Sequence, residues 1–195
     1  MPCVDVNNVE AGRLATTHLI ALGHRRIAAF CGNHDFCSNP QRLTGYRQAL
    51  QEAGIVFDPR LVFAGEYHAE WGAKNAHRLL DEFSSADRPT AVFGFCDAVA
   101  VGALAAFAER GVRVPEDISV IGMDDIPAAS ALNMTTVRQS VRDIGAQSVQ
   151  TLLSLLGNNL DFVPRVLLMP ELRERRSVGA GPYATSPESS GRETA

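Results

Sequence analysis

Hydrophobic residues along this chain alternate between two spacings, one typical of helices and one typical of buried strands. Between Asn8, a candidate N-cap, and Gly23, a candidate helix stop, apolar residues recur three and four positions apart, which predicts a helix. The next apolar run, Ile27–Cys31, has the length of a strand. Residues 33–41 lack such a pattern and predict a loop. The order of a helix followed by a strand then repeats three times along the chain. Helices are predicted at about 43–53, 70–83 and 98–110, and strands at 61–64, 90–95 and 118–122.

This strict alternation favours an α/β fold, in which a parallel sheet is flanked by helices on both faces. Right-handed crossovers then place the functional loops at the carboxyl ends of the strands. The regular alternation of helix and strand ends after residue 125. From there the pattern predicts a short extended segment at 135–137, an amphipathic helix at 144–156 and a last strand at 166–169. From about residue 179 the sequence is small, polar and proline-containing, which predicts a disordered tail.

Composition and charge narrow the possible functions. The chain has 195 residues, of which 46% are hydrophobic, and this is enough for a sizeable core without disulfides. Its 18 Lys and Arg against 22 Asp and Glu give a net charge of −4, so we expect no basic face for nucleic acid. The cysteines and histidines lack metal-ligand spacing. No apolar run is long enough to cross a bilayer, and the first residues do not form a signal-peptide pattern.

Polar residues stand just beyond four predicted strands, where ligands bind in open α/β folds. Arg42 offers a planar fork of donors, Asp124 a bidentate acceptor, and Tyr67 a flat apolar face with a polar edge. These groups suit a polyhydroxylated or planar polar ligand. The full set is Ser38 and Arg42, Glu66 and Tyr67, Cys96 and Asp97, and Asp124 and Asp125.

Each of these residues also has a purely structural interpretation. Asp97 most simply caps the helix that follows it, and Asp124 and Asp125 cap the next short element as readily as they bind a ligand. A lone arginine such as Arg42 is more often a solvated residue of the first helical turn. An aromatic residue beside a strand, such as Tyr67, is usually part of the core.

The motifs of common enzyme classes are missing from the sequence. There is no glycine-rich phosphate loop after a strand, no P-loop and no G-x-S-x-G nucleophile elbow. The adjacent carboxylates of Asp124 and Asp125 point in different directions and make a poor acid–base pair. We therefore expect no catalytic residue, no cofactor and no metal, which disfavours an enzyme built on a Rossmann-like fold.

Five segments together resemble the effector-binding domain of LacI/GalR-family transcriptional regulators. The resemblance covers about residues 4–178. It implies a fold of the periplasmic binding protein type, a small effector such as a sugar or purine held between two Rossmann-like subdomains, and a homodimer that binds operator DNA through an N-terminal helix-turn-helix. The segments are HLIALGHRRIAAFCG (18–32), RLTGYRQALQEAGI (42–55), PTAVFGFCDAVAVGAL (89–104), VPEDISVIGMDDI (114–126) and MTTVRQSVRDIGAQSVQTLL (134–153).

The resemblance assigns roles to five residues. Arg42 matches the arginine of the family's R-x-x-G-[YF] motif, and Asp124 matches the first aspartate of its G-[YF]-D-[DN] motif; both contact the effector in such proteins. Tyr67 matches an aromatic that stacks on the effector, and Ser38 matches a small hydroxyl residue near the arginine. Cys96 stands where the family commonly has an effector-contacting asparagine, and a thiol is a weak hydrogen bonder, so the effector's identity is open at this position.

The resemblance also implies a domain organisation. We expect an effector-binding domain over 1–178, made of a C-terminal subdomain over about 7–135 plus 166–170 and a remnant of an N-terminal subdomain over about 141–162, followed by the tail at 179–195. The DNA-binding headpiece is expected to be absent from this chain, and the apolar face of the helix at 144–156 is expected to be uncovered, which favours association. These features predict the effector-binding part of a cytoplasmic regulator of the repressor type that has no membrane partner. The alternative is a periplasmic-type sugar-binding protein.

Overall fold

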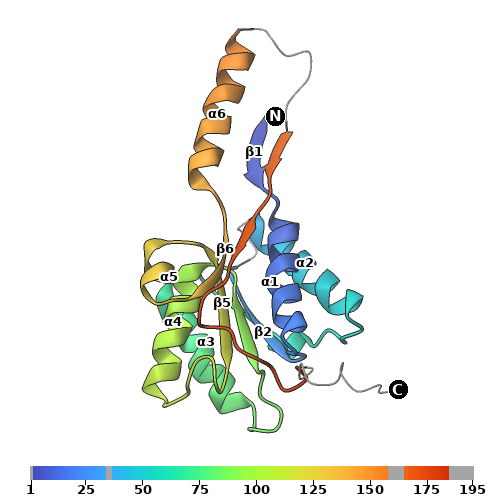
Figure 1. Cartoon of the computed structure of the whole chain (residues 1–195), viewed down its shortest axis with the longest axis vertical. Helices are drawn as coiled ribbons and strands as arrows, with labels where there is room; N and C mark the ends of the chain where they lie inside the picture. Colours follow the sequence, from blue (N-terminus) through green and yellow to red (C-terminus); the bar gives the residue numbers. More distant parts are fainter. Residues whose placement is uncertain (1, 34–36, 158–164, 185–195) are drawn as a thin grey trace, which may run out of the picture.

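A six-stranded sheet forms the centre of the larger part of the molecule, which we call the body (Figure 1). The computed structural model describes residues 2–33, 37–157 and 165–184. Neighbouring strands are parallel except for the last pair, β6 and β8, which is antiparallel. In spatial order the strands are β3 (Val62–Ala64), β2 (Ile27–Cys31), β4 (Ala91–Gly94), β5 (Ser119–Asp124), β6 (Thr135–Arg138) and β8 (Glu171–Arg173).

Two pairs of helices cover the two faces of this sheet, as the alternating pattern predicts. Helices α1 (Asn8–Ala21) and α2 (Ser38–Glu52) pack on one face, and α3 (Ala69–Glu82) and α4 (Asp97–Glu109) pack on the other. Because successive strand residues point to opposite faces, Phe93 packs with the first pair and Val92 with the second. A short 3₁₀ helix, η1 (Pro59–Leu61), precedes β3, and a short helix, α5 (Pro127–Ala131), follows β5.

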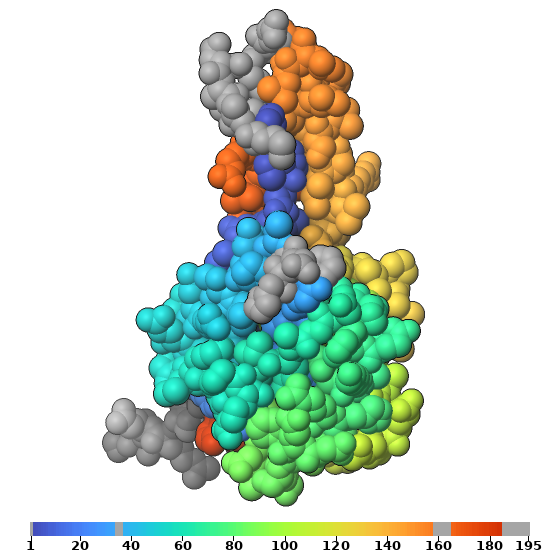
Figure 2. Space-filling view, turned by 180° about the vertical axis from the view of Figure 1, so that it is seen from behind, coloured from blue at the N-terminus to red at the C-terminus, as the bar shows by residue number. Residues whose placement is uncertain are grey.

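The smaller part, which we call the outer layer, rises above the body in both overall views (Figures 1 and 2). It consists of β1 (Cys3–Val6), α6 (Val141–Leu156) and β7 (Arg165–Leu168), with β1 and β7 paired in parallel. Three passages of chain join it to the body: the first at Asn7, the second at 139–140 and the third at 169–170. No helix among the described residues is long and apolar enough to span a membrane.

The last strands differ from the expectation that the segment at 166–170 belongs to the same subdomain as residues 7–135. Strand β7 pairs with β1 in the outer layer, and β8 at 171–173 takes the place beside β6. The sequence pattern places an apolar run at β7 but carries no information on its partner strand. The prediction of a strand here is therefore confirmed, but its assignment to the sheet of the body is wrong. The helix starts also shift: α2 begins at Ser38 instead of after a loop ending at residue 41.

The segment from Ser177 to Ala184 packs along the body, although we expected a disordered tail from residue 179. The Ser177 hydroxyl donates to the Val120 carbonyl at 2.6 Å, and the Gly181 amide donates to the Leu22 carbonyl at 2.7 Å. These bonds replace the core contacts that a sequence of small residues cannot make. The rest of the predicted tail, 185–195, lies outside the described residues.

Candidate functional site

Arg42 lies on the second turn of α2 and reaches the carboxyl edge of the sheet. Its side chain is buried, with 6% of the residue exposed, so the alternative of a solvated first-turn arginine is wrong. The guanidinium Nε donates to the Asn8 side-chain carbonyl at 2.9 Å, and Nη1 donates to the main-chain carbonyl of Phe95, just beyond β4. These bonds fix the plane of the guanidinium at the end of β4.

Asp124 is the last residue of β5 and lies at the same edge. Its carboxylate accepts a hydrogen bond from the Gln139 side-chain amide. Burial raises the pKa of this carboxyl to about 6, although the Arg42 guanidinium and the Gln139 amide both act in the opposite direction. The residue has a φ of 128°, a strained conformation for a side chain with a Cβ, and such strain is common at ligand sites.

The carboxylates beside Asp124 have structural roles. The Asp125 carboxylate accepts from Arg175 at 2.6 Å. The buried Asp97 carboxylate accepts from the Thr136 hydroxyl at 2.6 Å and from the Ile126 amide at 2.9 Å, so it ties the loop after β5 to β6. The prediction that Asp97 caps α4 is therefore wrong. Capping by Asp124 or Asp125 is not seen either, because the N-cap of α5 makes no side-chain hydrogen bond.

The Tyr67 ring, in the loop after β3, lies against the backbone of Gly32 just beyond β2. A Cβ at Gly32 would come within 2.5 Å of the ring, so glycine is required there. The phenol donates to the Asn39 side-chain carbonyl at 3.3 Å. Burial raises the pKa of Tyr67, and the nearby Arg42 guanidinium and Ser38 hydroxyl oppose that shift. Tyr67 thus lies beside both residues of α2.

Ser38 and Cys96 occupy the starts of two helices at this edge. Ser38 is the first residue of α2 and is half-buried, and Cys96 is the buried N-cap of α4. The Cys96 thiol lies 3.9 Å from the Tyr67 carbonyl. Burial raises the pKa of Cys96 to about 11, and both Asp124 and Arg42 act on it. The thiol is therefore neutral near pH 7 and contributes only a weak hydrogen bond.

Two polar residues of the site were missed by the sequence reasoning. Asn8 was assigned as the N-cap of α1, but the cap is Asn7, whose side chain accepts from the Glu10 amide at 3.0 Å. Asn8 instead holds Arg42. Gln139 follows β6, and since β6 is parallel to β5, the rule that selected Asp124 also points to Gln139.

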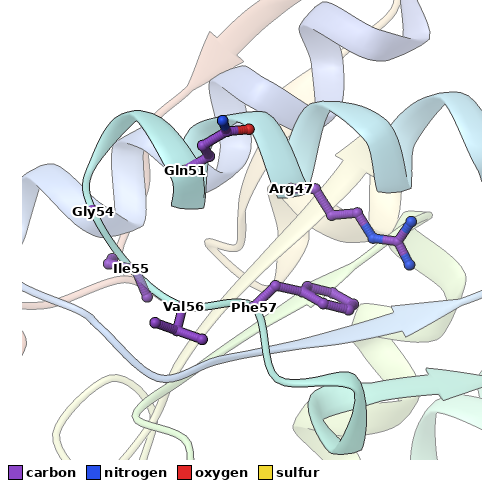
Figure 3. A pocket seen from close by; sticks show the side chains of 6 residues that line it. All are labelled: Arg47, Gln51, Gly54, Ile55, Val56 and Phe57. Carbon is purple, nitrogen blue, oxygen red and sulfur yellow. The ribbon is translucent and has the colours of Figure 1, made fainter.

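The five predicted site residues thus gather at the carboxyl edge of β2, β3, β4 and β5. The edge presents a cation, a carboxylate, a neutral thiol, a hydroxyl and an aromatic face, which is a set of groups for a neutral ligand with several hydroxyl or amide groups. A separate hollow at the other end of α2 is lined by Gln51, Gly54, Ile55 and Val56, with the Arg47 guanidinium 4.5 Å above the Phe57 ring (Figure 3). It lacks such convergent polar groups.

Comparisons with known proteins agree with this architecture. Residues 16–178 match the family described as periplasmic binding protein-like domain. The chain is 37% identical over 180 residues to the transcriptional repressor PurR of Haemophilus influenzae, a match that covers 90% of this chain and 53% of that protein. The chain therefore spans about half the length of the curated relatives it matches.

Solved structures show the same relationship. A LacI-family regulatory protein from Chloroflexus aggregans superposes with a TM-score of 0.86 at 32% identity, covering 93% of this chain and 65% of that one. The transcriptional regulator CelR, in complex with cellobiose, superposes with a TM-score of 0.84 at 35% identity, covering 91% of this chain and 54% of that one. These relatives are regulators, not enzymes. The chain belongs to the periplasmic binding protein-like domain family, in the form that serves LacI-family transcriptional regulators as their effector-binding domain.

Proposed function

We propose that this chain is the effector-sensing part of a transcriptional repressor and that it binds a small, neutral, polar ligand such as a sugar or a purine-like base. One observation carries the proposal: the Arg42 guanidinium, bonded to the Phe95 carbonyl just beyond β4, lies close enough to Tyr67, Cys96 and Asp124 to act on the pKa of each, although these residues are far apart in sequence. Relatives that are named as regulators, one of them in complex with cellobiose, support it.

Each side chain has a role in this proposal. Arg42 uses Nε and Nη1 for its bonds to Asn8 and Phe95, and in this proposal its Nη2 donates to the ligand. Asp124 accepts from ligand hydroxyl or amide groups. The Tyr67 ring stacks on an apolar ligand face, and Ser38 adds a hydroxyl that both donates and accepts. Cys96 can make only a weak bond, which favours a ligand without a strong donor or acceptor at that position. None of these roles involves catalysis, a cofactor or a metal.

In the complete regulator, ligand binding at this edge shifts the balance between an open and a closed arrangement of two subdomains. The shift changes DNA affinity only if the ligand binds one arrangement more tightly than the other. In this proposal a separate headpiece contacts operator DNA, since a net charge of −4 disfavours phosphate contacts by this chain. The complete regulator acts as a homodimer in the cytoplasm, beside its DNA.

A binding assay with named probes tests the proposal. Cellobiose, glucose, hypoxanthine and guanine are titrated separately into the chain, and the shift in melting temperature is recorded, because a ligand that binds only the folded state stabilises it by mass action. We expect one probe class to raise the melting temperature. The Arg42→Lys variant keeps the positive charge but loses the planar fork. It should therefore need at least a tenfold higher ligand concentration to reach the same shift in melting temperature.

The matched control is Arg47→Lys, on the same helix but exposed and directed at the Phe57 ring. It should bind the active probe as the unaltered chain does. Equal loss in both variants, or full binding by Arg42→Lys, would refute the assignment of Arg42 as a ligand contact.

A further inference from the structure

The two charged residues of the site are each bonded to a different passage between the body and the outer layer. Arg42 is bonded to Asn8, the first residue after the first passage. Asp124 is bonded to Gln139, the first residue of the second passage. The site therefore has one contact to each of two chain passages that lead into the outer layer.

The contact at the first passage is buried, and both the amide nitrogen and the oxygen of the Asn8 side chain are hydrogen-bonded. Asn8 is 4% exposed; its side-chain amide donates to the Val6 carbonyl at 3.2 Å while its side-chain carbonyl accepts from Arg42. The Asn7 amide in turn donates to the Leu168 carbonyl at 2.9 Å, which joins the first passage to the end of β7. Breaking the Arg42 contact would leave buried polar atoms without partners, so we expect it to persist.

The contact at the second passage is more open. Gln139 and Asp124 are both half-buried, and one amide-to-carboxylate bond joins their side chains. The backbone of Gln139 leads directly to α6, because its carbonyl accepts from the Val141 amide at 3.0 Å and the next residue, Ser140, caps that helix. Only Ser140 thus separates Gln139 from Val141, the first residue of α6.

We propose that Gln139 is a positioning residue that transmits the state of the Asp124 carboxylate to the second passage, while Asn8 keeps the first passage fixed to Arg42. The inference rests on the proposed function, in which a ligand hydroxyl donates to Asp124. Such a hydroxyl competes with the Gln139 amide for the carboxylate. Ligand uptake therefore frees the second passage and leaves the first in place, so that the outer layer moves about a fixed point at Asn7.

A double-mutant cycle on the ligand-free chain tests the contact by amide hydrogen exchange. Gln139→Met removes the donor at similar length, and Asp124→Ala removes the acceptor. Each should speed exchange of the Val141 amide about tenfold, the factor expected for a hydrogen bond to a charged group. The double variant should add nothing further, because both changes break the same bond. The Asn7 amide should keep its rate.

The opposite pattern is expected for Asn8→Ala, which should speed exchange at Asn7 and not at Val141. Gln48→Met, at an exposed position of α2, is the matched control and should change neither rate. Additive effects in the Gln139 and Asp124 cycle, or equal acceleration at Asn7 and Val141 in Gln139→Met, would overturn the proposal.

An NMR titration of the Asp124 side-chain carboxyl separates the bond from simple packing and needs no variant at Asp124. The Gln139 amide lowers the pKa of this carboxyl, so Gln139→Met should raise it further, and Gln48→Met should not. An unchanged Asp124 pKa in Gln139→Met would also overturn the proposal. Neither experiment uses an effector; if no probe binds but the cycle is non-additive, the coupling stands and the proposed function fails.

Discussion

The body and the outer layer are built from the same kinds of element but differ in what covers them. In the body, helices bury both faces of the sheet, and Phe93 and Ile121 are fully inaccessible. In the outer layer, α6 has one covered side, and Leu153 and Leu156 on its other side are 63% and 74% exposed. An amphipathic pattern therefore shows that a helix has an apolar face, but it does not show whether this chain supplies the cover.

The largest expected difference between the two regions concerns core truncation. Phe93→Ala should lower the free energy of unfolding by about 3–5 kcal/mol, because it leaves a cavity beneath α1 and α2. Leu153→Ala, on the exposed side of α6, should change it by less than about 0.5 kcal/mol. Urea denaturation followed by circular dichroism measures both, and similar losses would show that α6 is covered in solution.

Replacing a glycine by alanine should destabilise the body but stabilise the outer layer. A Cβ at Gly12 would lie 2.1 Å from the Arg42 carbonyl oxygen, where α1 crosses α2, so Gly12→Ala should cost about 1–3 kcal/mol. Nothing lies within 4 Å of a Cβ at Gly145 in α6, so Gly145→Ala should stabilise the chain by about 0.5–1 kcal/mol through helix propensity. Thermal melts of the two variants give the comparison, and a destabilised Gly145→Ala would contradict it.

The site at the edge of the body should reduce stability in a pH-dependent way. The pKa of Asp124 is raised to about 6 in the folded chain, above its ordinary value of 3.8, so ionising this group costs folding free energy. The penalty is absent below about pH 4 and complete above about pH 6. Asp124→Asn should therefore be more stable than the unaltered chain by about 1–2 kcal/mol at pH 8 and equal to it at pH 4. A difference that does not depend on pH would exclude this cause.

The smallest expected effect on stability is at the exposed apolar side of α6, where the effect on association should be larger. Leu153→Lys combined with Leu156→Lys should shift the melting temperature by less than about 2 °C, since surface changes are usually close to neutral. We expect the unaltered chain to associate in a concentration-dependent way in analytical ultracentrifugation, because this apolar side is exposed, and the same pair of substitutions should reduce that association. Unaltered association would show that another surface causes it.

The sequence predicted the body well, because its signals are local. Glycines such as Gly23 and Gly111 end helices with positive φ, and buried strands read as apolar runs. Two of the wrong predictions share one cause, which is competition for partners at long range: Asp97 is bonded to β6 instead of its own helix, and β7 pairs with β1. No local pattern records such partners.

In the candidate site, too, some residues could be predicted from the sequence and others were missed. The edge rule and the motif resemblance together identified Arg42, Tyr67 and Asp124, which lie together in the structure. Of the side chains that hold them, Asn8 was missed because its role depends on a residue 34 positions away. Gln139 was missed although it follows a strand parallel to β5, where the edge rule also applies.

The pairing of β1 with β7 joins residues 3–6 to residues 165–168. During translation, β1 therefore lacks its neighbour until the segment that runs to β7 has also been made. The intervening segment can complete its own sheet and helices meanwhile, since contacts between nearby segments close sooner than distant ones. Until β7 is made, the edge of β1 that will pair with it is exposed, and an exposed strand edge is a site that a chaperone can bind.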